Sequence, residues 1–184
     1  MKRHFLLFIL CGLPLTAAES TIDLDPGRTS IGFTLGDVLH TVHGGFKLKS
    51  GSVKFDPATG QASGRIVVDV TSGDSGNDSR DKRMQKQILE SSLYPEAIFT
   101  PDHVSGDWTP QGASELDLHG MFEIHGGSHE MTFHFRTEVK GADVAASTAF
   151  MIPYVEWGMK NPSNFLLKVN DKVEMNIQAK GRVR

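Results

Sequence analysis

Short stretches in which apolar and polar residues alternate recur along most of this 184-residue chain. Ile31, Phe33 and Leu35 are separated by Gly32 and Thr34, for example, and comparable stretches follow as far as the C-terminus. Alternation with a period of two places every apolar side chain on one face of a β-strand. Because a strand with a single apolar face must bury that face against other strands, the pattern predicts an all-β fold of antiparallel strands.

Glycine, proline, aspartate and asparagine separate these stretches, as expected for strands that are joined by turns. One segment, residues 79–91, has the spacing of a helix instead, with Met84 and Ile88 on one face and Asp78 or Ser79 as the N-cap. A sheet of about eight strands can close on itself and leave no exposed edge, which predicts a barrel or a sandwich. The alternation predicts strands over residues 31–35, 42–48, 53–55, 66–70, 98–104, 116–124, 131–136, 144–152, 165–169 and 173–183.

The N-terminus has the three parts of a secretory signal peptide. Lys2 and Arg3 are followed by an apolar stretch over residues 5–15 and then by the small residues Ala17 and Ala18. That stretch is about half as long as a membrane-spanning helix. We therefore expect a signal peptide over residues 1–18 and one mature domain over residues 19–184. Cleavage would remove Cys11, the only cysteine, so the mature domain would have neither a disulfide nor thiol chemistry.

The composition argues against some classes of function. Hydrophobic residues make up 39% of the chain and charged residues 22%, which is typical of a globular protein rather than a disordered one. The formal net charge of -3 argues against a nucleic-acid-binding protein, because such proteins carry an excess of lysine and arginine. No stretch approaches about 18 apolar residues, so we expect no transmembrane segment.

Histidines are the first candidates for chemistry. His119 and His125 share the polar face of one predicted strand with Glu123, and His129 and His134 follow closely. A metal site needs three or four converging donors, however, and neither His-Glu-x-x-His nor Cys-x-x-Cys is present. The many serines include no Gly-x-Ser-x-Gly motif. We therefore expect a solvated outer face without a catalytic residue or a metal. A secreted hydrolase or metal-dependent enzyme that uses the histidine-rich strands is the alternative.

Phenylalanines on the apolar strand faces have two interpretations. In a filled barrel they pack on one another as a core, whereas in a hollow barrel they line a cavity that can take an apolar ligand. A lipid chain gains about 0.8 kcal/mol for each methylene group that enters such a cavity. The residues alone do not distinguish the filled barrel from the hollow one. A third interpretation is an envelope protein with a filled core that acts through its surface.

Several motifs, in order along residues 21–184, resemble the YceI-like family of bacterial periplasmic polyisoprenoid-binding proteins. Residues 30–35 (SIGFTL) and 43–46 (HGGF) resemble two of its strands, and residues 119–126 (HGMFEIHG) resemble its Gly-x-Leu-x-Ile-His-Gly strand. Residues 75–84 (SGNDSRDKRM) and 94–99 (YPEAIF) resemble the most specific part, an Asn-x-x-Arg-Asp loop and helix before Tyr-Pro-x-x-x-Phe. Residues 152–159 (IPYVEWGM) lack the arginine of the family's Arg-x-Asp-Phe/Trp-Gly motif.

The resemblance implies a lipocalin-like antiparallel β-barrel with one short α-helix, which encloses a long apolar tunnel for a polyisoprenoid or another long-chain amphiphile. It further implies a periplasmic lipid-binding protein that is not an enzyme and needs no cofactor, with roles proposed in lipid carriage and stress response. A homodimer is compatible with the family. Tyr154 and Trp157 are expected at the mouth, because their polar groups suit a half-wet position. From the apolar faces we expect the other ligand-binding residues to be Phe33, Leu35, Phe46, Phe55, Val68, Met84, Ile88, Phe99, Phe122, Ile124, Phe133, Phe135, Phe150 and Ile152.

Overall fold

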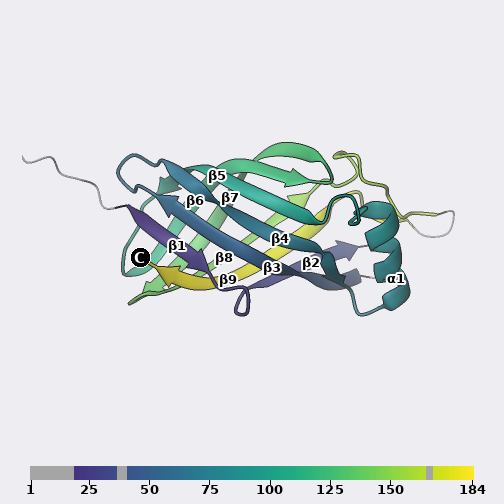
Figure 1. The fold of residues 1–184 in the computed structure, drawn as a ribbon, viewed down its shortest axis with the longest axis horizontal. Helices are drawn as coiled ribbons and strands as arrows, with labels where there is room; N and C mark the ends of the chain where they lie inside the picture. Colours follow the sequence, from purple (N-terminus) through teal and green to yellow (C-terminus); the bar gives the residue numbers. More distant parts are fainter. Residues whose placement is uncertain (1–18, 37–40, 165–167) are drawn as a thin grey trace, which may run out of the picture.

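In the part of the chain that the structure describes, the alternating stretches form nine antiparallel β-strands that close into an elongated barrel, with one short helix across one end (Figure 1). The structure, a computed structural model, describes residues 19–36, 41–164 and 168–184. The helical segment between β4 and β5 consists of α1 (Asp78–Arg83) and the π-helix η1 (Met84–Ile88). The strands are β1 (Ser20–Leu24), β2 (Ser30–Gly36), β3 (Thr41–Phe55), β4 (Ala62–Asp74), β5 (Glu96–Gly106), β6 (Gly112–Ile124), β7 (Gly127–Lys140), β8 (Asp143–Ile152) and β9 (Val173–Val183).

Closure of the barrel depends on β1 and β2, which share one position in the ring of strands. β1 pairs with β3 through Ser20 and Phe55, and with β9 through Ile22 and Val183. β2 pairs with the other halves of the same two strands. The ring therefore runs β3-β2-β9-β8-β7-β6-β5-β4 and returns to β3. This confirms the predicted antiparallel barrel of about eight strands, which is lipocalin-like in form.

Some of the expected strand boundaries are wrong. Two short strands are expected over residues 42–48 and 53–55, but β3 runs through both. Register shifts after Gly45 and Leu48 bend β3 and break its alternation without ending the strand. β1 is not predicted, because its short apolar pattern falls below the length that periodicity detects. The strand expected over residues 165–169 falls largely on residues 165–167, outside the described residues, and Val169 forms a single bridge.

The helical segment begins one residue earlier than expected. Asn77, rather than Asp78 or Ser79, is the N-cap. Its backbone is extended, and its side-chain oxygen accepts a hydrogen bond of 3.0 Å from the Arg80 backbone N–H. The polar residues before the helix therefore fix the point where it starts.

The helical segment also ends earlier than the expected residue 91. α1 widens into η1, in which the Leu89 N–H donates to the Met84 carbonyl at 2.9 Å. Glu90 then has a left-handed backbone with a φ of 45°, which an α-helix of L-residues does not continue through. The segment, called here the lid, thus consists of the six residues of α1 and the five residues of η1.

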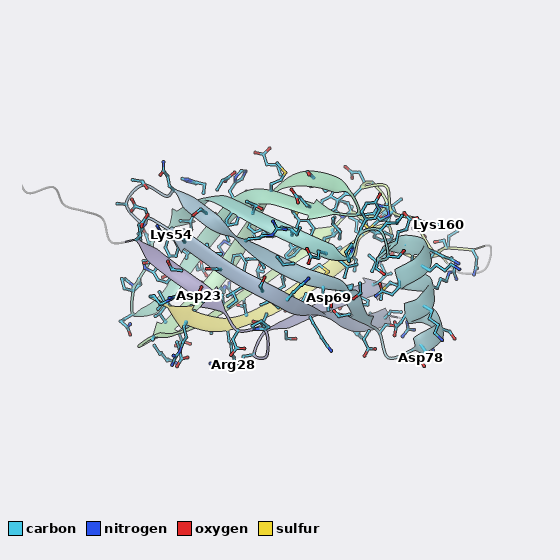
Figure 2. The ribbon with its side chains drawn as sticks, viewed as in Figure 1. Asp23, Arg28, Lys54, Asp69, Asp78 and Lys160 are labelled. Atoms are coloured by element: carbon cyan, nitrogen blue, oxygen red, sulfur yellow. The ribbon has the colours of Figure 1, made fainter. Side chains whose placement is uncertain are left out.

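The two ends of the barrel differ in structure. α1 and η1 lie across one end, called here the helix end, and β9 finishes at the opposite, far end (Figure 1). Figure 2 places Asp78 and Lys160 at the helix end and Lys54 toward the far end. Far from the helix, Phe55 is 3% exposed and packs edge-on against Trp108, with ring centroids 5.1 Å apart. Among the described residues there is no apolar helix of membrane-spanning length.

Candidate functional site

The helix end of the barrel is hollow. A cavity of about 550 Å³ lies between the inward faces of the strands and the inner side of α1 and η1. This volume falls within the range of about 300–1,000 Å³ that is common for small-molecule pockets. Apolar and aromatic side chains form almost all of its lining, and Ser75, Ser79, Arg80 and Arg83 are the strongly polar exceptions. The barrel is therefore neither wholly filled nor hollow along its whole length.

Most of the expected ligand-binding residues line this cavity. Each strand contributes alternate side chains to the interior, as its period of two requires. Contact of these side chains with a ligand stays a prediction. The expected residues that line the cavity are Phe33, Leu35, Phe46, Val68, Met84, Ile88, Phe122, Ile124, Phe150, Ile152 and Tyr154.

The other expected residues are not part of the lining, which is formed without Phe55, Phe99, Phe133, Phe135 and Trp157. Phe55 belongs to the filled far half. Phe99 and Phe133 pack edge-on against each other in the core, with ring centroids 4.9 Å apart, and Phe135 packs behind Phe133. Alternation tells which face of a strand a side chain occupies, but it does not tell how far along the barrel that side chain lies.

The lining also contains residues outside the expected set. Those on the strands share apolar faces with the expected residues, so the same alternation indicates them. The alternation of Val173, Met175 and Ile177 on β9 was a sufficient signal to find them. The remaining apolar members are Ile31, Val42, Val70, Leu89, Ala97, Met159, Pro162 and Val169.

Two arginines bring positive charge to the helix end of the cavity. Arg80 donates from Nε to the Ser75 hydroxyl and from Nη2 to the Ser75 carbonyl, both at 2.7 Å. Asp81 holds Ser75 in turn, since its Oδ1 accepts from the Ser75 backbone N–H at 3.0 Å and from the Ser75 hydroxyl. Arg83 donates to the Pro162 carbonyl at 3.2 Å. Within the described part of the chain neither guanidinium forms an ion pair, so both keep free N–H donors at the rim.

Tyr154 lies deeper than expected. It is 5% exposed, and its hydroxyl donates to the Asn170 carbonyl at 2.7 Å. Burial, with a smaller contribution from the Asp171 carboxylate, raises the pKa of Tyr154 to about 12. Tyr154 is therefore a buried wall residue with a satisfied hydroxyl, and the expectation of a half-wet mouth residue is wrong.

Trp157 is half-buried and packs against the cavity residue Phe122, with ring centroids 6.0 Å apart, but does not itself line the cavity. Its ring stacks on His129, with centroids 3.8 Å apart and an angle of 10° between the planes. Nε2 of His129 is buried and has no hydrogen-bond partner among the described residues. Burial lowers the pKa of His129, opposed by the Glu156 carboxylate. A neutral imidazole thus packs between β7 and the segment that carries Trp157.

The histidine-rich strands do not bring their donors together. His119 lies between two carboxylates, with Nδ1 at 2.6 Å from Asp102 Oδ1 and Nε2 at 3.1 Å from Glu130 Oε1. The hydrogen bond to Asp102 is the main cause of a raised pKa at His119. His125 turns away to Glu90, at 2.9 Å. In the described ranges, no three His, Cys, Asp or Glu side chains are arranged to hold a metal. A metal-dependent enzyme, the alternative, would require such a group of side chains, and the described residues do not form one.

A second hollow, at the far end, differs in chemistry. Although its volume of about 650 Å³ is larger, charged side chains such as those of Asp25 and Arg182 form much of its lining. Some of its charged side chains already form ion pairs: Arg28 lies 3.5 Å from Asp143, and Arg184 pairs with Asp23. An apolar ligand gains little there, so the cavity at the helix end is the candidate site.

Comparisons with solved structures agree with this fold. BcnA from Burkholderia cenocepacia is 19% identical, with a TM-score of 0.71 and coverage of 86% of this chain and 99% of that chain. A polyisoprenoid binding domain from Saccharophagus degradans, implicated in plant cell wall breakdown, is 16% identical, with a TM-score of 0.69 and coverage of 89% and 98%. The YceI protein of Campylobacter jejuni is 14% identical, with a TM-score of 0.58 and coverage of 99% and 98%.

At these identities the structural likeness shows the fold alone. No curated protein matches the chain by sequence. The family model described as the YceI-like domain, however, matches residues 23–181, from β1 almost to the end of β9. The resemblance of the motifs is thereby confirmed, and the chain belongs to the YceI-like domain family.

Proposed function

We propose that this protein binds a polyisoprenoid or a similar long-chain amphiphile, with the tail in the cavity and the polar head at the helix end. The observation that carries the proposal is the apolar cavity of about 550 Å³ with Arg80 and Arg83 at its rim. Binding of this kind makes and breaks no covalent bond, so the proposal is a binding protein rather than an enzyme.

Burial of the tail supplies the driving force. Each methylene group that leaves water contributes about 0.8 kcal/mol, so ten groups contribute roughly 8 kcal/mol. That corresponds to a dissociation constant of about 1 μM before the entropic costs of binding are subtracted. An apolar tail therefore accounts for useful affinity without any specific contact.

The rim suits a polar head group. Arg80 and Arg83 present N–H donors beside the hydroxyls of Ser75 and Ser79, and all four residues line the same cavity. Arg80, Arg83 and Ser79 are exposed, so a head group placed there keeps contact with water. Arginine is well suited to phosphate and carboxylate groups because its fork of donors matches their oxygens.

The comparisons support this proposal by analogy. The Saccharophagus degradans neighbour is described as a polyisoprenoid binding domain and shares the barrel with this chain. The expected signal peptide over residues 1–18 supports a periplasmic location, in which a carrier or a sequestering protein would keep a lipid tail out of water. Periplasmic location and a homodimer stay predictions.

A matched pair of tryptophan substitutions tests the proposal. Phe122→Trp adds bulk to the cavity, whereas Met121→Trp adds the same ring to the outer face of β6, where Met121 is 39% exposed. Polyprenyl phosphate is titrated against each protein, with displacement of a fluorescent lipid as the signal. We expect weaker binding of at least tenfold for Phe122→Trp and no change for Met121→Trp. Equal affinities in all three proteins, or no binding to the unmodified protein, would contradict the proposal.

A further inference from the structure

The cavity ends at one level of the barrel. On β5, Ala97 lines the cavity, whereas Phe99, two residues further along the same face, does not. On β9, Ile177 lines the cavity and Ala179 does not. No residue of β7, which is described in full, takes part in the lining. A layer of side chains at the level of Phe99 therefore closes the cavity from below.

Phe133 is the centre of this layer. Its ring centroid lies 4.9 Å from that of Phe99, 4.4 Å from that of Phe150 and 6.3 Å from that of Phe122. Phe122 and Phe150 line the cavity, but Phe133 is 4% exposed and does not. Phe133 thus lies directly behind two lining rings and beside Phe99.

Gly120 allows Phe99 to lie across the interior. A Cβ atom at position 120, on the inward face of β6, would lie 2.3 Å from the Thr100 carbonyl oxygen, 2.7 Å from the Pro101 Cα and 2.9 Å from the tip of the Phe99 ring. The β5 backbone therefore excludes a side chain at position 120, and the tip of the Phe99 ring lies over this glycine. Phe99 and Phe133 together form what we call the floor of the cavity.

The barrel is packed beyond the floor. Val104, Leu116 and Leu118 are each at most 8% exposed, and Phe55 and Trp108 pack edge-on further toward the far end. Interiors of this kind have the density of organic crystals and accept an added chain only if side chains are displaced. A tail that reached the floor would have no open path past it.

We propose that Phe99 and Phe133 set the maximum length of lipid tail that the cavity accepts. The inference rests on the proposed function, because it concerns the ligand of the same cavity. Each methylene group of the tail that fits between the rim and the floor raises the affinity for the lipid about fourfold. Methylene groups that do not fit between the rim and the floor stay outside the barrel and do not raise the affinity. The long tunnel implied by the family resemblance is thus divided by the floor, and a long polyisoprenoid would leave part of its tail at the mouth.

A series of straight-chain fatty acids tests the floor. Each acid, longer than the last by two carbons, displaces a fluorescent fatty-acid analogue from the purified protein. For the unmodified protein we expect the affinity to rise with length and then level off at a break. Phe133→Ala removes the six carbons of the ring and should move the break to longer chains, by about as many carbons as were removed. Ala97→Leu raises the floor and should move the break to shorter chains.

Phe55→Ala is the matched control, because Phe55 is as buried as Phe133 but lies in the far half of the barrel. It should leave the break unchanged. Phe133→Leu replaces the alanine variant if that protein does not fold. A break that stays in place in the Phe133 and Ala97 variants, or that moves equally in Phe55→Ala, would overturn the role of the floor while lipid binding stands. Failure of the unmodified protein to bind any fatty acid or polyprenyl phosphate would contradict the proposed function itself.

Discussion

His125 Nε2 lies 2.9 Å from Glu90 Oε2, and these are the two non-glycine residues with a positive φ in the described chain. Glu90 has a φ of 45° where the helical segment ends, and His125 has a φ of 51° in the two-residue turn between β6 and β7. Such backbone conformations are uncommon for residues other than glycine and are kept where surrounding contacts impose them. The hydrogen bond therefore joins two strained turns and ties the end of the lid to the barrel wall.

Loss of this bond should loosen the lid. Asparagine tolerates a positive φ, so His125→Asn removes the bond to Glu90 without adding backbone strain. We expect a loss of about 1 kcal/mol in the free energy of unfolding. Hydrogen exchange should become faster in η1, and a bound lipid should dissociate faster, because the lid opens more often. The measurement is hydrogen–deuterium exchange resolved by peptide, together with stopped-flow release of a fluorescent lipid.

Glu123→Gln is the control for the lid, because Glu123 is exposed on β6 and two residues from His125. It should change neither exchange in η1 nor lipid release. Unchanged exchange in His125→Asn would show that the hydrogen bond does not hold the lid.

Acidification should destabilise the packing of Trp157 on His129. Burial lowers the pKa of His129 in the folded protein, so the unfolded chain takes up a proton more readily. The stabilisation by the neutral ring is complete above the unfolded pKa of about 6.5 and is lost as the pH falls toward the lowered, folded value. The Glu156 carboxylate opposes the shift and reduces the effect.

Fluorescence of Trp157 reports this transition in a Trp108→Phe background, which leaves one tryptophan in the chain. We expect the emission and the melting temperature to change together below about pH 6.5. His129→Phe keeps an aromatic ring against Trp157 but cannot be protonated, so this part of the pH dependence should disappear. The same pH dependence in both proteins would assign the transition to another group.

Arg83 should favour lipids with an anionic head group. Arg83→Gln removes one charge from the rim and should weaken binding of polyprenyl phosphate by about three- to tenfold. Binding of the corresponding polyprenol, which carries no charge, should not change. Because Arg83 is exposed, added salt should reduce the difference between the two lipids.

Lys82→Gln provides the matched control for charge, since Lys82 is in the same helix but does not line the cavity. The measurement is isothermal titration of both lipids into the three proteins at low and high salt. Equal losses in Lys82→Gln and Arg83→Gln would mean that the general charge of α1, rather than a contact at the rim, attracts the head group.

The architecture could be predicted because it depends on local pattern. Alternation such as that of Ile31, Phe33 and Leu35 requires a one-sided strand, and many one-sided strands require a closed or stacked sheet. Strands that follow one another in sequence are then expected to pair as neighbours. The resemblance to the family motifs predicts that the barrel is lipocalin-like. The bulges of β3 could not be predicted, because a local break in alternation looks the same as the end of a strand.

The extent of the cavity could not be predicted for a geometric reason. Phe33 and Phe99 have the same kind of pattern in sequence, but Phe33 lines the cavity and Phe99 forms its floor. Their height along the barrel depends on register and tilt, which join residues distant in sequence. The local sequence around Arg80 and Arg83 does not indicate a ligand site, because only the docking of α1 on the barrel places them at the rim.

Mass spectrometry of the protein as purified from its envelope fraction tests the central claim most directly. The protein is analysed first under native conditions and then after solvent extraction, beside Phe122→Trp prepared in the same way. Our account predicts about one equivalent of a long-chain amphiphile in the unmodified protein and much less in the variant. An empty protein that also fails to take up added polyprenyl lipids would contradict it.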